Sequence, residues 1–134
     1  MKVLTLIGCG LAYAAVFSLN IKDDLNQSIE RGKELYMESC VSCHLANGQA
    51  VKGTFPPLAK SDFLLKYPEK SIHSIKFGMT GKVVVNGVTY NSAMPPSGFA
   101  DDEIADVMNY IRNSFGNKNT EMITQKMVAA IKEK

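Results

Sequence analysis

The stretch "SCVSCHLA", residues 39–46, places Cys40, Cys43 and His44 within five consecutive positions. A structural zinc ion needs about four ligands, and with His73 as the only other histidine the chain would have to borrow carboxylates. A thioredoxin-like dithiol follows a strand and begins a helix, whereas the residues before Cys40 have a helical pattern. A plain disulfide would use both thiols and leave His44 without a role.

The pattern C-x-x-C-H gives all three residues a role. It is the attachment signal of c-type haem, in which both thiols add to vinyl groups of the haem and the adjacent imidazole binds the iron. A chain with three Cys and two His among 134 residues would show this pattern by chance on the order of once in a thousand sequences. We therefore predict one haem c, held covalently by Cys40 and Cys43, with His44 as an iron ligand.

The N-terminus has the pattern of an export segment. After a single Lys2, residues 3–19 are apolar or small and carry no charge. We expect residues 1–20 to be a cleaved signal peptide or a retained membrane anchor, and "LIGC" leaves open lipid attachment at Cys9. The remaining chain is then expected to be periplasmic or membrane-associated on the periplasmic side, where thiols oxidise unless they are committed to a bond.

The helix predicted before the motif carries a second pattern. Ser28 can cap a helix that runs to about Glu38, and Gly32, Tyr36 and Cys40 fall on one face of it. The stretch "GKELYMESCVSCH" resembles the opening of a class I c-type cytochrome, a small monohaem protein whose first helix carries a glycine, an aromatic residue and C-x-x-C-H at these intervals. The resemblance extends over about residues 28–117.

The resemblance implies a mainly α, cytochrome c-like fold of three to five helices around one covalently bound haem, with a short β-hairpin before the distal methionine loop. Asn86-Gly87, between "VVV" and "VTY", is typical of a hairpin turn. The stretch 101–117 has the apolar spacing of an amphipathic helix, with Gly116 past the end of that helix. By the resemblance, this last helix crosses the first near Gly32, with Tyr110 at the contact.

These patterns predict the organisation of the chain. We expect residues 21–117 to form the cytochrome c domain. Residues 118–134 are expected to form a C-terminal extension, in which apolar residues at roughly helical spacing predict a short helix.

A proline-rich loop follows the motif. Gly53, Pro56 and Pro57 disfavour regular helix and suit a loop wrapped around a ligand. An iron-bound imidazole is held in orientation when its other ring nitrogen donates to a carbonyl group. The resemblance implies that the Pro56 carbonyl is this acceptor and that Leu58 contacts the haem. In the alternative interpretation, the two prolines are ordinary loop residues and have neither role.

The second axial ligand of the iron decides between electron transfer and small-molecule chemistry. Met94 precedes Pro95 and Pro96, so its backbone is predicted to be extended, and in the resembled family the ligand methionine is commonly followed by proline. Met79, in the glycine-flanked loop "FGMTG", is the alternative. Methionines on helical faces are expected to fill the core, and His73 is expected to lie away from the iron.

An iron held between His44 and Met94 keeps six ligands in both redox states and has no open site for exchangeable ligands. We therefore expect a single-electron carrier or an electron-transfer subunit of a respiratory chain, not an enzyme, with a dehydrogenase, reductase or terminal oxidase as partner. The rival hypothesis is a haem enzyme, or a sensor of gas or peroxide, in which Met94 is displaced. The stretch "VVVNGVTYNSAMPP" most resembles cytochromes that serve periplasmic dehydrogenases and copper-containing reductases.

Overall charge is nearly balanced, with 15 Lys and Arg against 13 Asp and Glu. Six lysines lie in residues 52–82 and four acidic residues in 101–106, an asymmetry that can orient a protein in the field of a partner. By the resemblance, lysines near the haem are expected to contact an acidic redox partner. The absence of an interleaved basic and aromatic stripe argues against nucleic acid. Membrane contact is expected only through an uncleaved N-terminus or a lipidated Cys9.

Overall fold

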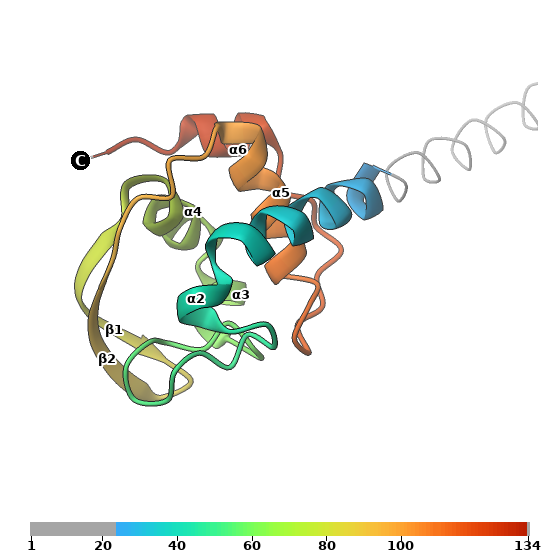
Figure 1. Cartoon of the computed structure of the whole chain (residues 1–134). Helices are drawn as coiled ribbons and strands as arrows, with labels where there is room; N and C mark the ends of the chain where they lie inside the picture. The colour runs from blue at the N-terminus through green and yellow to red at the C-terminus, as the bar shows by residue number, and fades with distance from the viewer. Residues whose placement is uncertain (1–23, 134) are drawn as a thin grey trace, which may run out of the picture.

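The computed structural model describes residues 24–133 (Figure 1). The export segment predicted at residues 1–20, including Cys9, lies outside the described residues. The first helix covers residues 24–39. The elements that follow are α2 (Val41–His44), α3 (Asp62–Lys66), α4 (Pro68–Phe77), β1 (Met79–Val85), β2 (Val88–Met94), α5 (Asp101–Ile111) and α6 (Gln125–Ala130). In the described residues, five helices precede the extension and β1 and β2 form a two-stranded antiparallel sheet. The predicted, mainly helical architecture with one short hairpin is confirmed.

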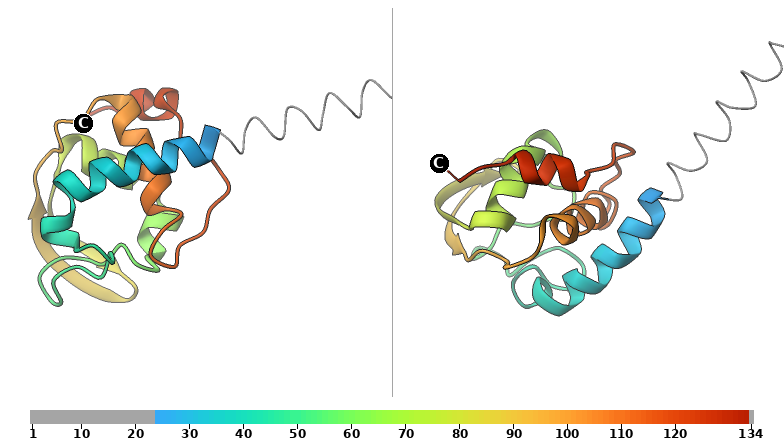
Figure 2. Two further views of the ribbon diagram at one scale, coloured as in Figure 1. Left: turned by 45° about the vertical axis from the view of Figure 1, so that its right-hand side comes forward. Right: turned by 90° about the horizontal axis from the view of Figure 1, so that it is seen from above.

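The first helix crosses α5 at Gly32 (Figure 2). A β-carbon at position 32 would lie 2.0 Å from the Asp106 carbonyl oxygen and 2.9 Å from the Tyr110 β-carbon. Any larger residue would therefore push the two helices apart. The crossing predicted near Gly32, with Tyr110 at the contact, is confirmed.

Three aromatic rings pack beside this crossing. The ring centroid of Tyr36 lies 5.3 Å from that of Tyr110 and 5.3 Å from that of Phe115. The Tyr36 hydroxyl donates to the Leu45 carbonyl at 2.7 Å, which ties the first helix to the chain after α2. Helix α5 ends at Ile111, a few residues before the predicted end ahead of Gly116. Phe115 and Gly116 have positive φ angles of 58° and 81°, which an α-helix does not contain.

The hairpin has the turn that the sequence predicts. Asn86 and Gly87 have φ angles of 52° and 77°, as a two-residue turn of type I′ requires. The Asn86 N–H donates to the Asp62 carboxylate at 2.7 Å, and the Asp62 N–H donates to the Asn86 side-chain oxygen at 3.0 Å. This reciprocal pair fixes the hairpin against α3, while Val83 and Val85 are buried on the inner face of the sheet.

Helix α5 is the central helix, and residues 104–112 are all buried. It begins after Ala100, whose side chain cannot cap a helix. The Glu103 carboxylate instead accepts a hydrogen bond from the Ala100 N–H at 2.9 Å, which supplies half of a capping box. Acidic residues in the first turn also interact favourably with the helix dipole.

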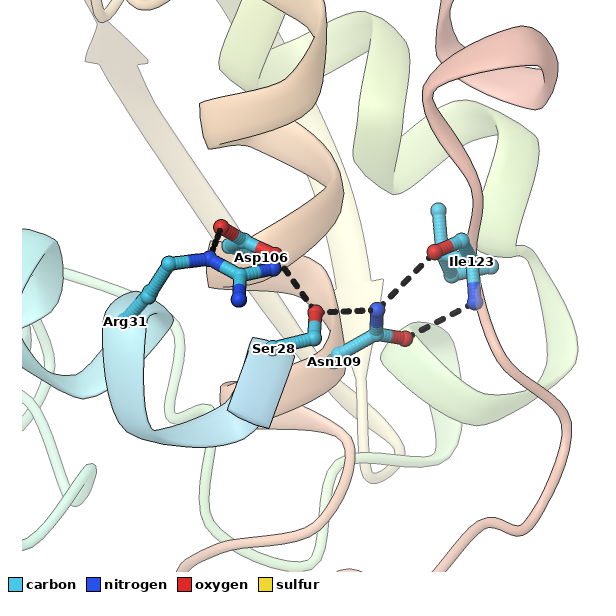
Figure 3. A network of polar contacts seen from close by, with 5 residues as sticks. All are labelled: Ser28, Arg31, Asp106, Asn109 and Ile123. Atoms are coloured by element: carbon cyan, nitrogen blue, oxygen red, sulfur yellow. Dashed lines mark hydrogen bonds and ion pairs between the residues drawn. The ribbon is translucent and has the colours of Figure 1, made fainter. Parts of the chain in front are cut away.

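A network of buried polar contacts joins the first helix, α5 and the C-terminal extension (Figure 3). The Asn109 side chain donates to the Ile123 carbonyl at 2.9 Å and accepts from the Ile123 N–H at 2.8 Å. It also donates to the Ser28 hydroxyl at 2.8 Å, and that hydroxyl donates to the Asp106 carboxylate at 2.6 Å. Arg31 adds two bonds to Asp106, at 2.6 and 2.8 Å.

The extension contains α6, where the apolar spacing predicts a short helix. Thr124 precedes it and accepts a hydrogen bond from the Met127 N–H through its side chain. Ile123 and Val128 are almost completely buried, so the extension contributes to the apolar core. Within residues 24–133, none of the helices has both the length and the apolar composition that crossing a bilayer requires.

Candidate functional site

An apolar pocket lies among the first helix, the loop around Pro56, α4, the hairpin and α5. Its walls bring together Cys40 and His44 of the predicted attachment motif with Met79 and Met94 of the hairpin. The other apolar or aromatic residues that line it are Tyr36, Pro56, Pro57, Leu58, Phe63, Leu64, Ile75, Val83, Val85, Val107 and Ile111. A pocket lined mostly by apolar and aromatic side chains suits a large, mostly apolar cofactor.

Four serines also line this pocket, and sequence reasoning did not single them out. The hydroxyls of Ser61, Ser71, Ser74 and Ser97 are each hydrogen-bonded to a backbone group nearby in the chain. Because these hydroxyls already have partners, the serines do not make the pocket polar.

Cys40 and Cys43 are half-buried free thiols at the one-turn helix α2. Cys40 precedes this helix and lines the pocket, whereas Cys43 lies within the helix. Burial raises the pKa of Cys40 to about 11, and the neighbouring Cys43 adds to the rise. A reactive dithiol needs a lowered pKa, so the site argues against the thioredoxin-like alternative. No cluster of three metal-binding His, Cys, Asp or Glu side chains forms within residues 24–133.

The His44 ring lines the pocket beside the Pro56 carbonyl. Burial lowers the pKa of His44, and the Pro56 carbonyl acts in the opposite direction. Nδ1 is buried and has no hydrogen-bond partner among the described residues. Burial favours the neutral imidazole, which is the form that binds metals.

The loop that carries Pro56 and Leu58 is held at its base by Gly48. The Leu58 N–H donates to the Gly48 carbonyl at 2.8 Å, and the Asn117 side chain donates to the Leu58 carbonyl at 2.7 Å. Gly48 has a φ of 69°, and a β-carbon there would lie 2.5 Å from the Phe115 ring. Pro56 and Leu58 therefore reach the pocket from a backbone that is fixed by other parts of the fold.

Met79 and Met94 form the first cross-strand pair of the hairpin, and both line the pocket. The prediction that Met79 lies in a glycine-flanked loop is wrong, because the β-ladder extends to Met79 despite Gly81. Residues directly opposite each other in an antiparallel pair project on the same face of the sheet. Gly78 packs against the end of β2: a β-carbon there would lie 2.7 Å from the Met94 carbonyl oxygen and 3.0 Å from Pro96 Cδ.

The remaining predicted features are His73 and the lysines of residues 52–82. His73 stacks on Phe77, with ring centroids 5.1 Å apart, and is not among the residues that line the pocket. Lys76 pairs with Asp101 at 2.7 Å, and its side chain is only 19% exposed. One lysine of the basic segment and one acid of the acidic segment thus pair with each other.

The family model for cytochrome c matches residues 29–115, which include the attachment motif, the pocket loop and the hairpin. The chain belongs to the cytochrome c family. The predicted resemblance and the cytochrome c-like fold are thereby confirmed. Membership implies a covalently bound haem c and a role in haem-mediated electron transfer.

Two kinds of relatives share this cytochrome c sequence. Cytochrome c-552 of Thermus thermophilus is 39% identical over 93 residues, which cover 64% of this chain and 69% of the relative. The gluconate 2-dehydrogenase cytochrome c subunit of Pantoea cypripedii is 30% identical over 110 residues, or 78% of this chain and 24% of the subunit. The alcohol dehydrogenase (quinone) cytochrome c subunit of Komagataeibacter europaeus is 28% identical over 116 residues, or 76% and 22%. The chain thus matches about a quarter or less of each dehydrogenase subunit.

The pocket residues fit a haem. The pocket is apolar, its wall carries Cys40 and His44, and the buried Nδ1 of His44 has no partner within residues 24–133. Pro56, Met79 and Met94 also line the pocket. When bound, the haem supplies one-electron redox chemistry, and the protein supplies its attachment, orientation and exclusion of water.

Proposed function

We propose that this chain carries single electrons on one haem c, attached through Cys40 and Cys43 and ligated by His44 and Met94. The observation that supports this most directly is the meeting of His44 and Met94 on the walls of one apolar pocket. A soft thioether opposite an imidazole raises the reduction potential, and such a pair leaves the iron without an exchangeable position.

His44 is proposed to bind the iron through Nε2 while Nδ1–H donates to the Pro56 carbonyl. The support is that Nδ1 is buried without a hydrogen-bond partner among the described residues, and that the Pro56 carbonyl acts on the pKa of the His44 ring. A small closing movement of the ring or the loop would complete the bond, which then fixes the ring orientation and makes the imidazole more basic. Leu58, on the same loop and in the same pocket, is proposed to contact the haem.

Met94 is preferred to Met79 as the distal ligand because its backbone is more constrained. Gly78 packs against the Met94 carbonyl, two prolines follow, and the Ser97 N–H donates to the Ile75 carbonyl at 2.9 Å. A ligand fixed in place by its backbone needs little rearrangement between redox states. This is the property that single-electron transfer uses.

The electron donors and acceptors are proposed to be redox proteins at the outer face of the cytoplasmic membrane or in the periplasm. The apolar, uncharged residues 3–19 support export. The likeness to cytochrome c subunits of two dehydrogenases supports a dehydrogenase as one partner. With two protein ligands, the iron would have no free position for a substrate. This chain would therefore relay electrons for a partner enzyme and catalyse no reaction of its own.

Spectroscopy of the mature holoprotein tests the proposal. We expect the haem to stay with the polypeptide in acid-acetone, one haem per chain, and a ferric protein with the weak long-wavelength absorption band of a thioether–iron bond. Redox titration should follow a single one-electron step. Haem that is extracted cleanly would contradict covalent attachment. A high-spin ferric spectrum would instead favour an enzyme or a sensor with a displaced methionine.

A further inference from the structure

We propose that Lys76 is a positioning residue for Met94, through which the C-terminal extension holds the methionine side of the pocket in place. The proposal rests on the proposed function, because it takes Met94 as the distal ligand of the iron.

Lys76 joins three elements of the fold from the last turn of α4. Its Nζ pairs with the Asp101 carboxylate at 2.7 Å and donates to the Val128 carbonyl at 3.1 Å. Asp101 begins α5 and Val128 lies in α6. The two paired side chains are 19% and 29% exposed, so solvent screens this pair less than a pair on the open surface. Hydrogen bonds with charged partners in such places are among the stronger ones in proteins.

The same turn of α4 holds the chain around Met94. The Ile75 carbonyl accepts from the Ser97 N–H at 2.9 Å. Gly78, which follows α4 directly, packs against the Met94 carbonyl oxygen so closely that a β-carbon there would lie 2.7 Å away. Ile75 and Met94 both line the pocket. A displacement of this turn would therefore reach Met94 through two contacts.

The Val128 carbonyl, which accepts the hydrogen bond from Lys76, is itself held in place by the fold. The Val128 side chain is completely buried, and the extension is anchored a few residues earlier by the two hydrogen bonds between Asn109 and Ile123. The carbonyl that Lys76 contacts thus belongs to a rigid part of the core. Through this hydrogen bond, the C-terminal extension restrains the last turn of α4, which lies far from the extension in the sequence.

This arrangement has a measurable consequence for the iron site. An external ligand can occupy the distal position only in molecules from which Met94 has withdrawn. Removing Lys76 removes two restraints on the turn that supports Met94, so the open population should rise and the apparent affinity for an external ligand should rise with it.

Imidazole titration of the ferric holoprotein, followed by the loss of the thioether–iron band, measures this population. Lys76→Met keeps the length of the side chain and removes its charge and its donors. We expect Lys76→Met to bind imidazole about tenfold more tightly than the unsubstituted protein. Asp101→Asn, which weakens the same pair from the other side, should shift the affinity in the same direction. Lys76→Arg, which keeps the charge, should restore most of the original affinity.

Lys70→Met is the matched control. Lys70 lies on the same helix, is exposed, and places its amine over the Tyr67 ring at 4.8 Å. We expect it to leave imidazole affinity unchanged. Thermal unfolding of each variant separates local opening from a general loss of stability.

Several results would overturn the proposal. Unchanged imidazole affinity in both Lys76→Met and Asp101→Asn would do so, even if their melting temperatures fall, because Lys76 would then be purely structural. An equal rise in Lys70→Met would do so as well. If the unsubstituted ferric protein lacks the thioether–iron band, the proposed His/Met ligation fails and this proposal fails with it, so the two failures are distinguishable.

Discussion

Met79 and Met94 lie directly opposite each other across the hairpin, and both line the same pocket. Their backbones differ in constraint. Gly78 packs against the Met94 carbonyl and two prolines follow Met94, whereas Met79 begins a strand that continues through Gly81. Two thioethers are thus available at one place, and substitution of each gives a different expected outcome.

Replacement of Met94 by alanine should remove the proposed distal ligand and leave the haem attached, because the proposed attachment is through Cys40 and Cys43. We expect Met94→Ala to lose the thioether–iron band and to have a lower reduction potential. Electron exchange with a redox partner should slow. Absorption spectra and redox titration of the purified variant check these outcomes.

Met79→Ala is the matched control for this prediction. It removes a thioether from the same face of the hairpin, and we expect the absorption band and the reduction potential to be retained. If Met94→Ala keeps the band and Met79→Ala loses it, Met79 is the ligand and the constraint on the Met94 backbone serves another purpose.

Local patterns predicted much of this fold and site. The attachment motif depends on sequence spacing alone, and Gly32 could be recognised because glycine in mid-helix lowers helix stability unless a close contact needs it. The Asn86-Gly87 turn also has a local signal, since few residues other than Asn and Gly accept positive φ there. These features could be predicted because each is decided by residues that are neighbours in the chain.

Contacts between segments that are distant in the sequence could not be predicted in this way. Glycines flank Met79, which suggested a loop, and only the pairing of β1 with β2 shows that Met79 belongs to a strand. Gly48 must be glycine because the Phe115 ring occupies the space of a β-carbon, and that ring comes from beyond α5. Lys76 was counted only among the lysines of residues 52–82, and its pairing with Asp101, 25 residues further along the chain, has no local sequence signal. Tertiary packing decides all three.

Gly32→Ala should destabilise the protein although alanine favours helix. The new β-carbon would lie 2.0 Å from the Asp106 carbonyl oxygen, so the first helix and α5 must move apart. We expect a net loss of about 1–3 kcal/mol in the free energy of unfolding, after a propensity gain of about 1 kcal/mol. Denaturant unfolding measures it. Lys33→Ala, on the exposed side of the same helix, should change stability by less than about 0.5 kcal/mol, and an equal effect at both positions would contradict the steric explanation.

Asp62 should make the stability of the hairpin sensitive to acid. The Asn86 N–H is the main reason that the pKa of Asp62 lies below its usual value of 3.8. A carboxyl with a lowered folded-state pKa contributes stability that is fully present above about pH 4 and is lost as the pH falls through the lowered pKa. The unsubstituted protein should therefore lose stability more steeply than Asp62→Asn in this acid range. Urea unfolding at a series of pH values tests this, with Glu34→Gln as a control for removal of an exposed acid; identical slopes for Asp62→Asn and the unsubstituted protein would refute it.

Asn109→Ala should release the C-terminal extension. The buried Asn109 side chain makes two hydrogen bonds with Ile123 and one with Ser28, and its removal leaves buried polar groups without partners. We expect a loss of about 3 kcal/mol in the free energy of unfolding, together with faster proteolysis within residues 118–133. Asn91→Ala, at an exposed position of β2, should affect neither measurement. A stability loss without faster cleavage of the extension would show that Asn109 mainly joins the first helix to α5 through Ser28, and that the extension is held by its apolar contacts instead.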